Sequence, residues 1–217
     1  MIELFNEGGF LMYPIFFSSL LAIAIFFERM FYLRSVKTST RKFSNRIKDL
    51  VRKGNIDFAI TACRKTFTPI SQIVLAALLR YGSPREEIKE VIEDTSYLEI
   101  PVLEKNLPIL STVANIAPLL GLLGTVFGMI KGFQVISAMG VGNPEALAGA
   151  ISEALLTTAF GLSVAIPTIV AYNYLAHRVE RQIREMNSTC LEILDLLSTK
   201  QENYEEGVKV NEILSNQ

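Results

Sequence analysis

The chain has 217 residues, half of them hydrophobic, with 21 basic side chains, 22 acidic side chains and one histidine, so its formal net charge is −1. This balance gives no reason to expect a polyanionic partner such as nucleic acid. Two distant cysteines and one histidine provide no spacing typical of a metal site.

Three long segments carry almost no charge. Gly8–Phe27 has 20 residues and Leu107–Ile130 has 24, all uncharged, whereas Ala146–Ala176 has 31 residues and a single charged one, Glu153. A helix of about 20 apolar residues spans a bilayer, and inside lipid the backbone must satisfy its own hydrogen bonds. The sequence therefore predicts an all-α integral membrane protein with three transmembrane helices and long helical extensions in the cytoplasm.

The basic residues predict the orientation of these helices. Of the 21 Lys and Arg residues, 15 lie between Arg29 and Lys105, five follow Ala176, and Lys131 is the remaining one. Basic flanks of membrane helices face the cytoplasm. We expect residues 1–34 to hold the first helix with its N-terminus outside. The expected order is then a cytoplasmic helical region (35–106), a second span (107–139), an external turn (140–144), a third span (145–176) and a cytoplasmic helix and tail (177–217).

The N-terminus lacks the basic start and the small-residue cleavage site of a signal peptide, so we expect the first helix to be retained. Short soluble helices are predicted in the region after the first span. Apolar residues recur there at helical spacing up to a turn at Gly54-Asn55. The apolar run Ile70–Leu79 is too short to span a membrane and predicts a buried helix. Ser83 is expected to cap the next helix, with Pro84 at its first position.

After the third span, an amphipathic helix is predicted to extend to about Leu197. Its apolar face consists of Met186, Cys190, Ile193 and Leu197. We expect this helix to pack with the cytoplasmic helices of the preceding region. Cys63 and Cys190 both fall on the cytoplasmic side, which predicts reduced structural thiols.

The short turn Gly140–Pro144 makes the second and third helices antiparallel neighbours. Residues whose numbers sum to about 284 then lie at a similar depth, which places Lys131 level with Glu153 and Thr125 close to the level of Thr158. Lys131 has two alternative interpretations: an ion pair with Glu153, within or between subunits, or a side chain that extends to the outer interface. An ion pair would hold Glu153 ionised and leave it an electrostatic or structural role.

Both hairpin helices carry a stripe of small or weakly polar residues. The stripe residues are Gly121, Thr125, Gly128 and Gly132 in the second helix, and Ala154, Thr158, Gly161, Ala165, Thr168 and Tyr172 in the third. Small residues let membrane helices pack closely, so a packing seam is one interpretation of the stripes. The positions expected to allow close packing or to bend a helix are Gly121, Gly124, Gly128, Gly161 and Pro167.

Two segments resemble the signatures of the MotA/TolQ/ExbB proton-channel family. Leu119–Met129 (LLGLLGTVFGM) is similar to its second-helix signature, and Ile151–Leu162 (ISEALLTTAFGL) with Ala165–Pro167 (AIP) is similar to its third-helix signature. Phe26–Arg29 (FFER) resembles the inner end of the family's first helix, and Leu103–Pro108 (LEKNLP) resembles the start of its second. The layout with three spans is closer to the ExbB/TolQ branch than to the larger MotA branch.

The resemblance implies a ring-like homo-oligomer, a pentamer, in the bacterial inner membrane, with the N-terminus in the periplasm and the C-terminus in the cytoplasm. The second and third helices would line a central pore holding two copies of a single-span partner like ExbD or TolR, whose aspartate would carry the proton. By motif position, Thr125 and Thr158 would face that aspartate and Glu153 would be the pore carboxylate. Tyr172 lies further along the Thr158 stripe and is expected to face the same pore.

The hypothesis from these patterns is a proton-channel subunit of a motor that converts the proton motive force into mechanical work on envelope partners. A narrow, poorly hydrated pore disfavours a charged carboxylate, so Glu153 would take up and release protons. TonB-type import, Tol-type envelope maintenance and motility are all compatible with the sequence. A TonB-like or TolA-like protein is therefore a further candidate partner, besides membrane lipid.

The alternative is a passive membrane scaffold in which the small stripes only pack, although a scaffold has no need of Glu153 at membrane depth. No cofactor or metal is expected. An enzyme is not expected either, because the sequence offers no nucleophile–base set and no phosphate-binding glycine loop. Protons are favoured over sodium as the coupling ion because the spans lack a richer cluster of oxygen ligands.

Overall fold

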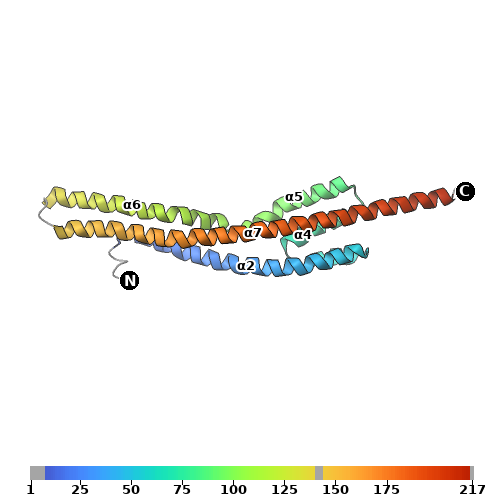
Figure 1. Ribbon diagram of the computed structural model, residues 1–217, viewed down its shortest axis with the longest axis horizontal. Helices are drawn as coiled ribbons and strands as arrows, with labels where there is room; N and C mark the ends of the chain where they lie inside the picture. The colour runs from blue at the N-terminus through green and yellow to red at the C-terminus, as the bar shows by residue number, and fades with distance from the viewer. Residues whose placement is uncertain (1–7, 140–143, 216–217) are drawn as a thin grey trace. The chain divides into compact units, whose positions relative to one another are not determined.

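The computed structural model describes residues 8–139 and 144–215, and every regular element within these ranges is a helix. The helices are α2 (Met12–Arg52), α3 (Ile56–Arg64), α4 (Pro69–Leu79), α5 (Arg85–Glu104), α6 (Leu107–Met139) and α7 (Pro144–Ser215), and all of them except α3 are labelled in Figure 1. The all-α prediction is confirmed for the described residues, which contain no strand. Most of the expected external turn, residues 140–143, lies outside the described residues.

The chain divides into two compact units. The membrane unit consists of the described residues up to Met30 together with 106–177, and the second unit consists of 31–105 together with the described residues from Arg178 onward. Three helical segments are long and apolar enough to cross a membrane, namely Met12–Val36, Leu107–Ala138 and Pro144–Ser198. This confirms the prediction of three apolar helices able to span a bilayer.

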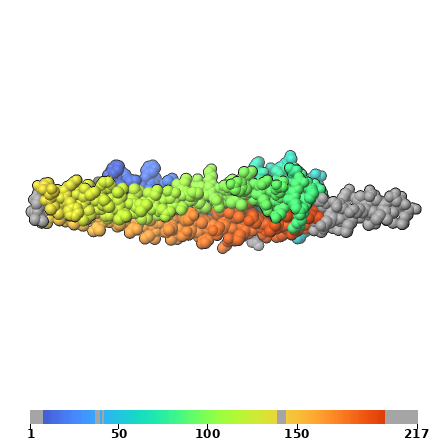
Figure 2. All heavy atoms as spheres, turned by 90° about the horizontal axis from the view of Figure 1, so that it is seen from above, coloured from blue at the N-terminus to red at the C-terminus, as the bar shows by residue number. Residues whose placement is uncertain are grey.

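In the membrane unit, α6 and the first part of α7 run side by side (Figure 1), and their atoms lie directly against one another in the space-filling view of Figure 2. Glycines make this close approach possible. A Cβ placed on Gly161 would lie 2.7 Å from the carbonyl oxygen of Ala117 and 3.0 Å from the Cα of Gly121. A Cβ on Gly128 would lie 2.5 Å from the Cβ of Ala154. Backbone therefore contacts backbone along this seam, as small residues allow in membrane helices.

The second unit has an aliphatic core built from all of its helices. Its fully buried side chains include Ile47, Ile70, Ile73, Ile88, Leu103, Met186 and Leu197. The predicted apolar face of the C-terminal helix is confirmed, since all four of its members are buried. Within this core the hydroxyls of Ser44 and Thr189 lie 3.0 Å apart and the Gln182 amide donates to the Leu33 carbonyl at 2.7 Å, so buried polar groups join α2 to α7.

Helix boundaries in the second unit follow turn chemistry. The predicted turn at Gly54-Asn55 is confirmed, with Gly54 at a φ of +80°, which glycine adopts without strain. The predicted cap at Ser83 is wrong, because Pro84 is the N-cap residue of α5 and no side chain caps that helix. Ser83 instead donates its backbone N–H to the Arg80 carbonyl at 3.0 Å, and so belongs to the turn that ends α4.

Cys63 is completely buried in the second unit, and this burial raises the pKa of its thiol from 9.0 to about 12. The thiolate is the reactive form, so at pH 8 the raised pKa alone should slow alkylation about a thousandfold, before any steric protection. We expect iodoacetamide to leave Cys63 unmodified in native membranes and to modify it fully after denaturation, as measured by peptide mass spectrometry. Phe67→Cys, which places a thiol where Phe67 is 90% exposed, is the positive control, and rapid native labelling of Cys63 would contradict the buried core.

Candidate functional site

The two isolated charges of the hairpin helices meet within one chain. The ammonium nitrogen of Lys131 on α6 lies 2.5 Å from Oε1 of Glu153 on α7. Of the two alternatives for Lys131, the structure shows the ion pair. The antiparallel register explains the pairing, because the same seam also brings Gly128 against Ala154.

The two partners differ in exposure. The Glu153 side chain is 24% exposed and the Lys131 side chain is 54% exposed. A lone charge near the centre of a membrane helix costs roughly 2.5–3.5 kcal/mol on insertion scales. A close, hydrogen-bonded pair reduces this cost because each charge compensates the other. The pair therefore explains how the apolar spans of α6 and α7 tolerate a carboxylate and an ammonium.

The chain segment before α2 covers the Glu153 carboxylate. Gly9 has a φ of +69°, and a Cβ on this residue would collide with Glu153 Oε1. The hydroxyl of Thr157, a residue only 1% exposed, lies 2.9 Å from the Gly8 carbonyl oxygen and 2.8 Å from the Glu153 carbonyl oxygen, so either one accepts its single proton. Only glycine provides both the backbone angle and the space that this approach requires.

A cavity of about 250 Å³ lies around these groups. Its lining residues are Gly8, Phe10, Leu11, Gly124, Phe127, Lys131, Glu153 and Thr157. We call this space the Glu153 chamber. It combines one carboxylate, one ammonium, a hydroxyl and a backbone carbonyl in otherwise apolar surroundings.

The other predicted site residues lie elsewhere in the membrane unit. The Thr158 hydroxyl donates to the Gly121 carbonyl of α6 at 2.7 Å, and the Thr125 hydroxyl donates to the Leu122 carbonyl of its own helix at 2.6 Å. Thr125, Thr158 and Tyr172 are each partly exposed, and none of them lines the Glu153 chamber. The structure thus brings Glu153 and Lys131 together and leaves these three residues apart from that pair.

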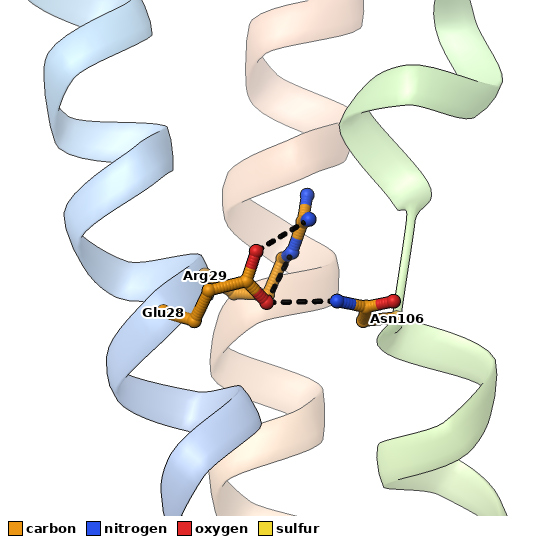
Figure 3. Close-up of polar contacts among 3 residues, drawn as sticks. All are labelled: Glu28, Arg29 and Asn106. Atoms are coloured by element: carbon orange, nitrogen blue, oxygen red, sulfur yellow. Dashed lines mark hydrogen bonds and ion pairs between the residues drawn. The ribbon is translucent and has the colours of Figure 1, made fainter.

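A second polar cluster joins α2 to the start of α6 (Figure 3). The Glu28 carboxylate accepts hydrogen bonds from Arg29, at 2.8 Å from Nη2, and from the Asn106 side-chain amide, also at 2.8 Å. The Arg29 side chain is 4% exposed, so its charge is compensated inside the protein. Asn106 has a φ of +64°, which asparagine tolerates better than most residues, and its carbonyl accepts from the Leu110 N–H at 3.3 Å.

A model of the MotA/TolQ/ExbB proton channel family matches residues 65–188, more than half of the chain. The chain belongs to the MotA/TolQ/ExbB proton channel family. The matched range contains Thr125, Lys131, Glu153, Thr158 and Tyr172. Membership supports a role in proton-channel energy transduction. No group of three or more His, Cys, Asp or Glu side chains that could hold a metal ion occurs among the described residues.

Named relatives place the chain in the ExbB/TolQ branch of this family. The putative biopolymer transport protein ExbB-like 3 of Synechocystis sp. is 30% identical over 177 residues, which are 81% of this chain and 84% of that protein. The biopolymer transport protein ExbB of Aquifex aeolicus is 37% identical over 129 residues, or 59% of this chain and 84% of the relative. The Tol-Pal system protein TolQ of Haemophilus influenzae is 44% identical over 81 residues, which are 37% of this chain and 36% of that protein.

Three contacts described above were not predicted from the sequence of this MotA/TolQ/ExbB family member, namely those of Thr157, of Gly8 and Gly9, and of Glu28 with Asn106. Thr157 carried a usable signal, because it follows Glu153 by four residues and so lies on the same helical face. Gly8 and Gly9 carried no such signal, since they stand at the start of the first uncharged segment, before α2 and outside the matched range. Glu28 and Asn106 were both within the motifs that resemble the family, yet nothing in the sequence paired them.

Proposed function

We propose that this chain is the ring-forming subunit of a proton-driven motor in the bacterial inner membrane. The observation that carries the proposal is the Lys131–Glu153 pair, set 2.5 Å apart on the apolar spans of α6 and α7. Ionisable residues within membrane segments mark ion pathways and relays more often than packing contacts. The family match and the relatives named ExbB and TolQ support the same function.

The proposed assembly is a pentamer with the N-terminus in the periplasm and the C-terminus in the cytoplasm. In it, α6 and α7 surround a central pore occupied by two copies of a single-span protein resembling ExbD or TolR. A TonB-like or TolA-like protein would receive the mechanical work. The driving force is the membrane potential and pH difference, about 2.3 kcal/mol per elementary charge for each 100 mV.

We assign different roles to the polar groups of the pore. A carboxylate of the partner carries the proton, and the hydroxyls of Thr125 and Thr158, with Tyr172, solvate it without carrying charge themselves. Glu153 contributes a carboxylate that is ion-paired with Lys131 at 2.5 Å. Alternate protonation of the two partner carboxylates then steps the ring around them.

Thr158→Val should lower proton flux at least about tenfold while the ring still assembles. Valine keeps the shape of threonine but removes the hydroxyl, and the lost hydrogen bond to the Gly121 carbonyl costs only about 1 kcal/mol of stability. Flux is measured with a pH-sensitive dye in proteoliposomes that contain the chain and its co-expressed partner. Assembly is measured by size-exclusion chromatography in detergent.

Thr158→Ser is the matched control, because serine restores the hydroxyl and should retain most of the flux. Wild-type flux in an assembled Thr158→Val ring would remove Thr158 from the proposed path. A loss of flux in both variants would assign the effect to packing of the seam, since serine lacks only the methyl group.

A passive scaffold is the second candidate, and one observation favours it. Gly121, Gly128 and Gly161 pack within a single chain, so the stripes of small residues are explained without any pore. Co-purification separates the two functions. A motor subunit should bring down a small single-span protein with an aspartate in its membrane helix, whereas a scaffold should not.

A further inference from the structure

Three parts of the chain lie around the Glu153 carboxylate, whose side chain is 24% exposed. Lys131 reaches it from α6, Thr157 lies one turn further along α7, and the backbone of Gly8 and Gly9 lies over it. Among the described residues that line the chamber, Lys131 and Glu153 are the charged ones. No other described ionisable group of the lining competes for the carboxylate.

The chamber has the composition of a site for a monovalent cation. The carboxylate of Glu153, the carbonyl of Gly8 and the hydroxyl of Thr157 are all oxygen ligands, the type that hard cations prefer. An ammonium is a compact cation with three donors and no acceptor, and the ammonium of Lys131 donates to Oε1 of Glu153. Lys131 differs from a free ion in one respect, because its charge is covalently attached to α6 and cannot leave.

We propose that Lys131 is a tethered cation that occupies the cation position beside Glu153 and, with the Gly8–Gly9 backbone over it, keeps the carboxylate from exchanging protons or binding a mobile cation. Lys131 would thereby determine which cation occupies the position beside Glu153. The relevance of this inference to transport rests on the proposed function. Glu153 is thereby held beside the ion path as the partner of Lys131 and does not itself carry the proton. The transported proton then passes between the partner carboxylate and the threonine hydroxyls.

The test is labelling of Glu153 by dicyclohexylcarbodiimide in membranes that contain the full-length chain. The reagent is apolar and modifies protonated carboxyl groups, so an ionised carboxylate held by an ammonium is protected. We expect wild-type Glu153 to be unlabelled, and Lys131→Met to be labelled at least about tenfold faster, because the stranded carboxylate takes up a proton. Peptide mass spectrometry reports the modified residue, and Glu153→Gln gives the background.

Two further measurements define the role of the charge. Lys131→Arg retains a cation at the same position and should leave Glu153 unlabelled. Adding sodium or potassium chloride should slow the labelling of Lys131→Met, because a mobile cation enters the vacated position, and equal osmolarity in sucrose should not. Gly9→Ala, whose added Cβ collides with Oε1, should open the chamber and increase labelling even with Lys131 in place.

Labelling of wild-type Glu153 as fast as that of Lys131→Met would overturn the proposal, and this result does not depend on any variant folding. Protection of Glu153 in a folded Lys131→Met chain would also overturn it, since something other than the ammonium would then hold the carboxylate. Labelling of Lys131→Met that salt leaves unchanged would overturn the cation site. All of these measurements proceed without a partner or a proton gradient, so they are independent of the flux experiment that tests the motor.

Discussion

Removing one member of the Lys131–Glu153 pair should destabilise the chain, and removing both should restore most of the stability. Lys131→Met leaves a carboxylate that is 24% exposed and lies under the Gly9 backbone, so we expect a loss of about 2–3 kcal/mol in the free energy of unfolding. Glu153→Gln leaves a lysine that is 54% exposed, whose long side chain can reach the interface, and should cost about 1 kcal/mol. Two neutral side chains leave no unpaired charge, so the double variant should return to within about 1 kcal/mol of the wild type.

The measurement is unfolding in mixed detergent micelles titrated with sodium dodecyl sulfate and followed by circular dichroism. The matched control is the Lys89–Glu93 pair on α5, whose side chains are 58% and 67% exposed at a separation of 3.6 Å. Variants of that pair should each change the stability by less than about 0.5 kcal/mol. The coupling energy of each pair is the difference between the stability change of the double variant and the sum of the changes of the two single variants. Equal coupling energies for the two pairs would show that the Lys131–Glu153 contact is an ordinary surface ion pair.

The spans and the register of the hairpin could be predicted because both depend on local sequence. A run without charges indicates a membrane helix directly, and a short turn fixes which residues of two antiparallel helices lie at one depth. This is why Lys131 could be placed level with Glu153 before the contact was seen. The apolar face containing Met186 and Cys190 was predictable for the same reason, since it follows from helical periodicity alone.

Contacts between distant segments could not be predicted in this way. Depth does not specify how each helix is rotated about its axis, and adjacent residues differ by about 100° in direction. Thr158 therefore donates to Gly121 across the α6–α7 seam, whereas its neighbour Thr157 contacts Gly8 from the segment before α2. The Glu28–Asn106 hydrogen bond joins residues 78 positions apart, and no periodicity connects them.

Gly161→Ala should prevent α6 and α7 from packing at their native distance. The added Cβ would lie 2.7 Å from the Ala117 carbonyl oxygen and 3.0 Å from the Gly121 Cα, both of which are backbone atoms that cannot rotate away. Overpacking of this kind costs typically about 1–3 kcal/mol, which exceeds the roughly 1 kcal/mol that alanine gains over glycine in a helix. We expect a net loss of up to about 2 kcal/mol in the free energy of unfolding, and loss of folded protein for the bulkier Gly161→Leu.

Gly149→Ala provides a control on the same helix, because a Cβ at Gly149 meets no atom within 4 Å. Its only effect should be the gain in helix propensity, so it should stabilise the chain or leave it unchanged. The difference between the two variants then isolates the seam from the general cost or benefit of replacing a helical glycine. If Gly161→Ala were as stable as Gly149→Ala in the unfolding titration, α6 and α7 would have to lie further apart than the structure places them. In that case the small residues of the seam would have to be explained by contacts with another chain.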